Sequence, residues 1–130
     1  MFKFRRKESA WEVVDTKDIE PIYMYPEFED EDMDVETMSD TDTRGTYVFD
    51  VKHKASHAAL QNAIVFAQQQ LLKEVAKRGY NILLIESWRL TIYRRGKYHR
   101  LEVEYCGRPA CILGKIPVIK PPPYMEVLRV

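Results

Sequence analysis

The sequence predicts an α+β protein in which one helix packs on an antiparallel, hairpin-based sheet. Three observations carry this prediction. Apolar residues recur at steps of three and four over residues 56–79, as on one face of a helix. Apolar and polar residues alternate over residues 82–112, and a glycine-containing turn divides that stretch into two strands. A third alternating run, residues 46–54, precedes the helix, so the expected order is β-α-β-β.

The predicted helix has recognisable signals at both ends. Ser56 suits the N-cap, where its hydroxyl oxygen accepts a hydrogen bond from the first turn, and Gly79 suits the left-handed position beyond the last turn. The side opposite the main apolar stripe carries a second, weaker apolar stripe, where a helix on a single sheet would be charged. We therefore expect a sandwiched helix whose second stripe forms a subunit interface. The residues of this stripe are Val65, Leu72 and Ala76.

The register of the hairpin follows from the sorting of its side chains. A two-residue turn at Arg95-Gly96 pairs Leu90 with Leu101 and produces one apolar and one polar face. A shift by one residue would scatter the apolar side chains over both faces. Glu86 is expected on the apolar face, opposite Tyr105. The remaining apolar-face residues are Trp88, Leu90, Leu101 and Val103, and the polar face holds Arg89, Thr91, Arg100, Glu102 and Glu104.

Residues 56–112 resemble the small YbjQ-like proteins, in which a helix runs into a GANAVV-type strand and the hairpin closes on YGTAV. Gly79 and Asn81 match the first motif, with Tyr80 in place of its alanine. The residues that match the second motif, with one extra residue among them, are Tyr105, Gly107 and Ala110. The resemblance implies a β-α-β-β subunit that assembles into a ring, typically a pentamer, with a heavy-metal-binding role.

Composition divides the chain into an acidic N-terminal arm at residues 1–43, the β-α-β-β core at 44–115 and a proline-rich C-terminal arm at 116–130. The formal net charge is zero but unevenly spread. Residues 1–43 hold 5 basic and 14 acidic side chains, and residues 44–130 hold 15 basic and 6 acidic ones. We expect the two halves to face each other within or between subunits. No segment has the pattern of a secretory signal or a membrane span, so we expect a cytoplasmic protein.

Nine carboxylates lie between Glu27 and Asp42, without any lysine or arginine. Three arrangements fit this composition: a solvated flexible loop, an electrostatic clasp onto the basic body, and a divalent-cation site built from oxygen ligands. The run lacks the glycine and the spacing of an EF-hand. The clasp would use Arg94, Arg95, Lys97 and Arg100 of a neighbouring subunit. The candidate metal ligands are Glu29, Asp30, Glu31, Asp32, Asp34 and Glu36.

Two cysteines and three histidines invite comparison with zinc sites. His53 and His57 are four residues apart, and Cys106 and Cys111 are five apart. The expected topology, however, places Cys106 near the start of the first strand and His53 at its far end. We therefore expect free thiols and no Cys₂His₂ site. The sequence contains no phosphate-binding glycine loop, nucleophile elbow or HExxH motif, so we predict a protein that is not an enzyme.

Two further segments suggest partners. The hairpin tip combines basic and aromatic residues, which suits single-stranded nucleic acid, although a solvated tip has the same composition. Its candidate residues are Arg94, Arg95, Lys97 and Tyr98. The tail contains a PPxY motif of the kind that WW domains bind, and the alternative is an arm laid over the next subunit. The candidate WW-binding residues are Pro121, Pro122 and Tyr124.

The apolar stripes and arms together offer more apolar surface than 130 residues can bury alone. The leading hypothesis is therefore a homo-oligomeric ring or cage, with divalent metal at its acidic segments as one option. The alternative is an adaptor that presents the PPxY motif to a WW-domain protein. An RNA-binding module that uses the basic hairpin is a third hypothesis, and no cofactor other than a divalent cation is suggested.

Overall fold

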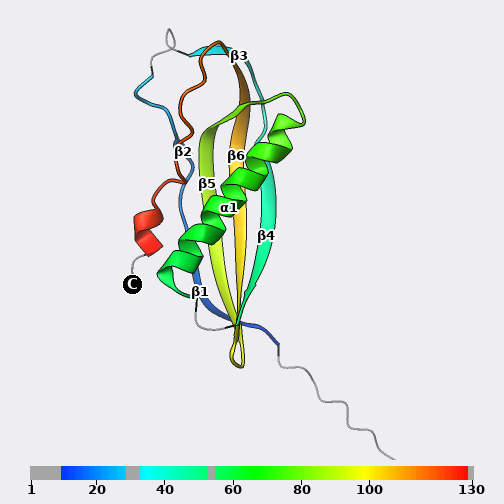
Figure 1. Ribbon diagram of the computed structural model, residues 1–130, viewed down its shortest axis with the longest axis vertical. Coiled ribbons are helices and arrows are strands. Elements are labelled where there is room, and N and C mark those ends of the chain that lie inside the picture. Colours follow the sequence, from blue (N-terminus) through cyan, green and yellow to red (C-terminus); the bar gives the residue numbers. More distant parts are fainter. Residues whose placement is uncertain (1–9, 29–32, 53–54, 129–130) are drawn as a thin grey trace, which may run out of the picture.

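The computed structural model describes residues 10–28, 33–52 and 55–128. Within these ranges a single α-helix lies on one face of a six-stranded antiparallel sheet (Figure 1). The elements are β1 (Glu12–Asp18), β2 (Ile22–Tyr23), β3 (Asp34–Met38), β4 (Thr43–Val51), α1 (His57–Ala76), β5 (Ile82–Arg95), β6 (Tyr98–Leu113) and the 3-10 helix η1 (Met125–Leu128). The predicted α+β class is confirmed.

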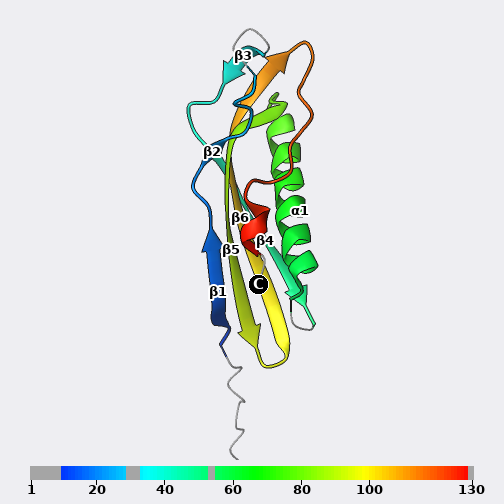
Figure 2. The same ribbon diagram turned by 90° about the vertical axis from the view of Figure 1, so that its left-hand side faces the viewer.

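Strands β5 and β6 form the centre of the sheet (Figure 2). β1 and β2 pair in succession with the outer edge of β5, and β4 and β3 pair with the outer edge of β6. The segment that we expected to form an acidic arm therefore contributes three strands to the sheet. β4, α1, β5 and β6 do follow one another in the chain, but the expected four-element subunit describes only part of this sheet.

The helix begins and ends where its sequence signals predict. The Ser56 hydroxyl oxygen accepts a hydrogen bond from the Ala59 amide at 3.1 Å, and Gly79 has a φ of 90° just after the helix. The predicted core face is buried, and its residues are Leu60, Ile64, Ala67, Leu71 and Val75. Among the described residues, no helix combines the length and apolar character needed to cross a membrane.

The turn of the β5–β6 hairpin lies one residue later than predicted. Its central residues are Gly96 and Lys97, so Leu90 pairs with Val103 and not with Leu101. Gly96 has a φ of 61°, as a type II′ turn requires at its first central position. The common two-residue hairpin turns, type I′ and type II′, both require a positive φ at the first central residue. In the predicted turn at Arg95-Gly96 that residue would have been the arginine. Because the pairing moves by two residues, both predicted faces of the hairpin are unchanged.

A β-bulge in β5 decides which side chains enter the core. The ladder skips Leu84, because the residue before it pairs with Pro109 and the residue after it pairs with Arg108. Side chains alternate along a strand, so one extra residue moves every later side chain to the opposite face. Glu86 and Trp88 consequently face α1.

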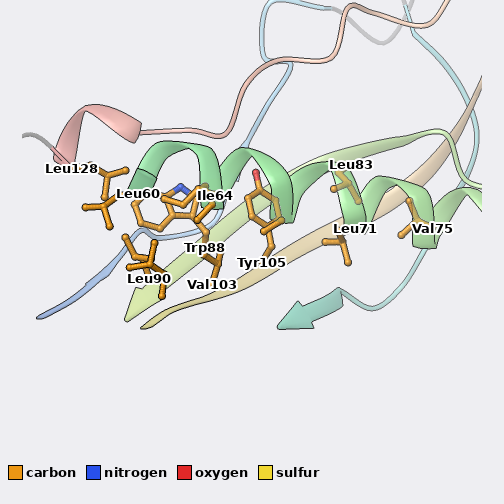
Figure 3. Close-up of a cluster of buried hydrophobic side chains, with 13 residues drawn as sticks. Leu60, Ile64, Leu71, Val75, Leu83, Trp88, Leu90, Val103, Tyr105 and Leu128 are labelled. Atoms are coloured by element: carbon orange, nitrogen blue, oxygen red, sulfur yellow. The ribbon is translucent and has the colours of Figure 1, made fainter. Parts of the chain in front are cut away.

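Buried apolar side chains form two clusters, one on each face of the sheet. Leu83 belongs to the larger cluster, and its neighbours Ile82 and Leu84 belong to the smaller one. The larger cluster lies between the sheet and α1 (Figure 3) and contains Leu60, Ala63, Ile64, Ala67, Leu71, Val75, Leu83, Trp88, Leu90, Leu101, Val103, Tyr105 and Leu128. The smaller cluster contains Met24, Tyr25, Met33, Ile82, Leu84, Ala110 and Ile112.

After β6 the chain turns back along the helix side of the sheet (Figure 2). The indole N–H of Trp88 donates to the Pro123 carbonyl at 2.8 Å, and the Lys17 ammonium donates to the Val127 carbonyl at 3.0 Å. Leu128 is fully buried in the larger cluster. The C-terminal segment, which we considered as an arm over the next subunit, therefore packs on its own chain.

The hairpin turn provides a test of the observed register. Gly96→Ala should lower the free energy of unfolding by about 1 kcal/mol, because alanine adopts a positive φ at a cost of that order. Lys97→Ala is the matched control and should have little effect, since Lys97 does not have a positive φ. Urea unfolding of both variants measures the difference. Equal stability of the two variants would contradict the assigned turn.

Candidate functional site

The first candidate site is a buried cluster of polar groups around Glu86, which is 1 % exposed. The Gln68 amide Nε2 lies 2.8 Å from Glu86 Oε1 and 2.9 Å from the carbonyl oxygen of Lys120. The hydroxyl of Tyr105, which points towards α1 in Figure 3, donates to the same Glu86 oxygen. The helix and both central strands thus meet at one carboxyl group, and the C-terminal tail bonds to the same Gln68 side chain.

Burial shifts the acidity of this cluster. It raises the pKa of Glu86 from 4.5 to about 7, although the hydrogen bonds from Tyr105 and Gln68 favour the ionised form. Burial also raises the pKa of Tyr105, with the nearby Glu86 carboxyl adding to the effect. The pKa of Tyr25, a member of the smaller cluster that interacts electrostatically with Glu86, rises to about 12 for the same main reason. The carboxyl can therefore exchange a proton near neutral pH. The Gln68 amide that donates to Glu86 also holds the tail at Lys120, so we expect the protonation of Glu86 to affect the stability of this cluster.

This buried carboxyl should make stability depend on pH. The folded chain holds the Glu86 proton more tightly than the unfolded chain, so the free energy of unfolding should fall as pH rises from 4.5 to about 7. A shift of this size corresponds to roughly 3 kcal/mol. Glu86→Gln keeps a hydrogen-bonding side chain without the charge and should be more stable than the wild type at pH 8, by up to that amount. Urea unfolding at pH 5 and pH 8 measures both effects.

A second tyrosine–glutamate pair provides the control for this test. On the outer face of the sheet, the Tyr93 hydroxyl donates to Glu102 Oε2 at 2.8 Å. Glu102→Gln should leave the pH dependence of the wild type in place, because this pair is not enclosed by the helix and the tail. If Glu86→Gln shows the same fall in stability between pH 5 and pH 8 as the wild type, Glu86 is not its source.

The second candidate site is the free edge of β4. This strand pairs with β6 along its whole length, and no strand in the described part of the chain pairs with its other edge. Beside the edge, on the helix side, three aromatic rings form what we call the aromatic flank. Phe66 of α1 lies 5.4 Å from the Phe49 ring and 6.5 Å from the Tyr47 ring, edge to face with both.

The path of the helix leaves the aromatic flank open. α1 crosses the sheet diagonally and approaches the start of β4, where Arg78 Nη2 donates to Thr43 Oγ1 at 3.1 Å (Figure 1). The helix covers the end of β4 less well, and its Phe66 side chain is 44 % exposed there. An apolar groove of about 340 Å³ results. It is lined by Phe49, Val51, Ala59, Asn62, Ala63, Phe66 and Leu101.

The two outer edges of the sheet differ in their protection against pairing. β1 carries a bulge between Val13 and Asp15, and charged side chains occupy four of its seven positions. Bulges and charges are devices by which edge strands avoid pairing with other chains. β4 is nine residues long, pairs with β6 without a bulge, and is charged only at Arg44 and Asp50. Its central Val48 is 55 % exposed on the outer face. The β4 edge is the unprotected one.

The acidic and basic halves of the sequence face each other within one chain. Among the residues that the structure describes, four ion pairs join an acidic residue of 1–43 to a basic residue of 44–130, with N–O separations of 2.5 to 3.7 Å. These pairs are Glu12 with Arg94, Asp18 with Arg89, Glu27 with Lys120 and Asp42 with Arg108. Two arginines expected to clasp a neighbouring subunit are thus engaged internally, Arg94 by Glu12 and Arg100 by Asp50. Exposed pairs of this kind add little stability individually.

Of the predicted metal ligands, Glu29, Asp30, Glu31 and Asp32 lie outside the described residues, and so does His53. Asp34 and Glu36 are exposed on β3, where Glu36 accepts a hydrogen bond from the Cys111 thiol at 3.5 Å. Within the described ranges no three His, Cys, Asp or Glu side chains are grouped as a metal site would require. A divalent-cation site at the acidic run stays a prediction.

The two thiols are free and separate. Cys106 pairs with Arg44 near the start of β4, as the expected topology requires. The β6 strand is regular between Cys106 and Cys111, since the nearby bulges are in β3 and β5. Residues an odd number apart on a regular strand point to opposite faces. The two thiols therefore cannot form a joint site.

At the hairpin tip the basic side chains contact groups of the same chain. The guanidinium groups of Arg95 and Arg100 lie 4.6 and 4.4 Å from the centre of the Trp11 ring, and Arg94 pairs with Glu12. Lys97 is exposed, and Tyr98 is 59 % exposed. Nucleic-acid binding at this tip stays a prediction.

The predicted WW-binding motif is partly enclosed. Pro121 and Tyr124 are exposed, but Pro122 is buried. Tyr124 has a φ of 56°, which departs from the polyproline II conformation that WW domains bind. The motif could reach a WW domain only after the tail leaves its place.

The predicted interface stripe on α1 is partly covered in the single chain. Val65 and Leu72 are half-buried and Ala76 is exposed. Val65 and Leu72 flank Gln68 at steps of three and four, on the side of α1 that the tail follows. The tail thus accounts for part of the sandwiched character that the sequence predicts.

No protein-family model matches this chain, and the searches of curated proteins and of solved structures also return no match. The resemblance to the YbjQ-like family stays a prediction.

Proposed function

We propose that the protein acts through self-association, as a homo-oligomer whose subunits join at the free edge of β4, and that it is not an enzyme. The observation that carries this proposal is a nine-residue edge strand that lacks protective bulges and lies beside the aromatic flank. Unpaired backbone groups along such an edge favour the addition of another strand. The apolar groove beside it would be removed from water at the same time.

The proposed interface differs from the one expected from the sequence. Val65, Leu72 and Ala76 remain a second candidate, because Ala76 is exposed and the other two are only half-buried. The β4 edge is the stronger candidate, because it offers backbone hydrogen bonds in addition to apolar surface. A ring needs two different, mutually complementary surfaces on each subunit, whereas a dimer needs one self-complementary surface. The β4 edge alone therefore supports a dimer.

A lysine on the outer face of β4 tests the proposal. The wild type should be a dimer at micromolar concentration. Val48→Lys should be a folded monomer, because a lysine in the middle of an edge strand opposes pairing with a strand of another chain. Val13→Lys is the matched control, since Val13 is also an exposed valine on an edge strand, at 60 %. It should leave the mass unchanged. Size-exclusion chromatography with light scattering gives the mass, and circular dichroism reports the fold.

Two results would count against this proposal. A wild-type monomer at high micromolar concentration would exclude self-association. Dissociation by Val65→Glu with Leu72→Glu, together with an unchanged mass for Val48→Lys, would move the interface to the second stripe of α1.

A further inference from the structure

We infer that the partner at the β4 edge is a second copy of this chain, bound antiparallel about a two-fold axis through Tyr47, so that Arg44 of each copy faces Asp50 of the other. This inference rests on the proposed function and names the partner and its register. It follows from symmetry, from the charges on the outer face of β4 and from the aromatic residues on its helix face.

Symmetry leaves few registers. In a two-fold antiparallel pair, the residue on the axis faces itself, and residues equally far from the axis face each other. Arg44 and Asp50 are each three residues from Tyr47, so an axis at Tyr47 makes them partners. An axis at Thr46 would place Arg44 opposite Val48, and an axis at Val48 would place Asp50 opposite Thr46. Opposite charges directly across two strands are favourable, so the axis at Tyr47 is preferred.

Arg44 and Asp50 each already form an ion pair within their own chain. Arg44 lies 3.3 Å from Glu104, and Asp50 lies 2.8 Å from Arg100. Pairing two copies at Tyr47 would extend these contacts into a row of alternating sign across the interface. The order would be Glu104, Arg44, then Asp50 and Arg100 of the second copy. The two-fold axis would produce this row twice.

The helix face of β4 is also self-complementary in this register. Phe49 would face Gly45 of the second copy, and Tyr47 would face itself. Gly45 offers no side chain, and the ring of its neighbour Tyr47 lies over it, since a Cβ at Gly45 would collide with that ring. Phe49 of one copy would therefore pack on Tyr47 of the other. Aromatic and β-branched cross-strand pairs are the stabilising units of antiparallel sheets.

The diagonal path of α1 fits this antiparallel arrangement. The helix approaches the start of β4 through the contact between Arg78 and Thr43, and it leaves the groove at Phe49 and Phe66 open near the end of the strand. Antiparallel pairing places the covered start of one β4 beside the open end of the other. The groove of each copy would then lie next to the C-terminal half of the other copy's helix.

Disulfide cross-linking reads the register directly. The full-length chain with Cys106→Ser and Cys111→Ser would carry either Thr46→Cys or Val48→Cys, both at exposed outer-face positions. With the axis at Tyr47, Thr46 faces Val48 of the second copy. An oxidised mixture of the two variants should therefore form covalent dimers. Each variant alone should not, because its two cysteines would be diagonal neighbours, offset by two residues from direct pairing, and too far apart for a disulfide. Non-reducing gel electrophoresis measures the covalent dimer.

The other cross-linking outcomes are equally clear. Covalent dimers from Thr46→Cys alone would place the axis at Thr46, and those from Val48→Cys alone would place it at Val48. Either result, or the absence of cross-links from a protein that is a dimer by light scattering, would overturn this inference while leaving self-association intact. A monomeric wild type would overturn both.

Charge reversal gives an independent measurement. Arg44→Asp alone places Asp opposite Asp50 at two symmetric positions, and Asp50→Arg alone places Arg opposite Arg44. Each variant should dimerise about tenfold or more weakly than the wild type. A mixture of the two variants should form heterodimers with near-normal affinity, because every cross-strand pair is then of opposite sign. Both variants lose the same internal ion pairs alone and in the mixture, so failure of the mixture to recover would overturn the inference.

Discussion

The pairing of β5 with β6 is the constraint on which the rest of the structure depends. Every other strand bonds to one of these two, and the apolar face of α1 covers them. The bulge at Leu84 then divides β5 between the two apolar clusters. Ile82 and Trp88 are six residues apart and would share a face in an uninterrupted strand, yet they lie in different clusters. The same bulge carries Glu86 into the interior, where hydrogen bonds from α1 and β6 offset part of the cost of burying a carboxyl group.

The features that could be predicted from the sequence are those with a strong local period or a specific cap. The helix was predictable because Ser56 and Gly79 mark its ends and its buried residues repeat with the helical period. The faces of the hairpin were predictable for the same kind of reason. Its register was not, because the deciding factor was which residue of the turn must adopt a positive φ. Glu86 was correctly expected on the core face. Its contact with Tyr105 is diagonal and not directly across the strands, because in the observed register Tyr105 pairs with Trp88.

Other features left no clear local signal. β1 and β3 are edge strands whose exposed side chains are largely charged or polar, so their composition resembled that of a solvated arm. The docking of the tail depends on Leu128 and on a carbonyl that accepts from Trp88, and an extended proline-rich segment has no periodicity to indicate either. Phe66 was not predicted as a site residue, because it belongs neither to the main apolar stripe of α1 nor to the stripe of Val65, Leu72 and Ala76. A large aromatic residue outside both stripes was the available signal.

The surroundings of the two tryptophans have a spectroscopic consequence. Trp88 is 2 % exposed, and its indole N–H is bonded to the tail, so its fluorescence should be blue-shifted and should respond when the tail leaves the helix. Trp11 lies beside two guanidinium groups near the hairpin tip, at the opposite end of β1 from the contact between Lys17 and the tail. A chain with Trp11→Phe would thus carry a single tryptophan, placed where the sheet, the helix and the C-terminal segment meet.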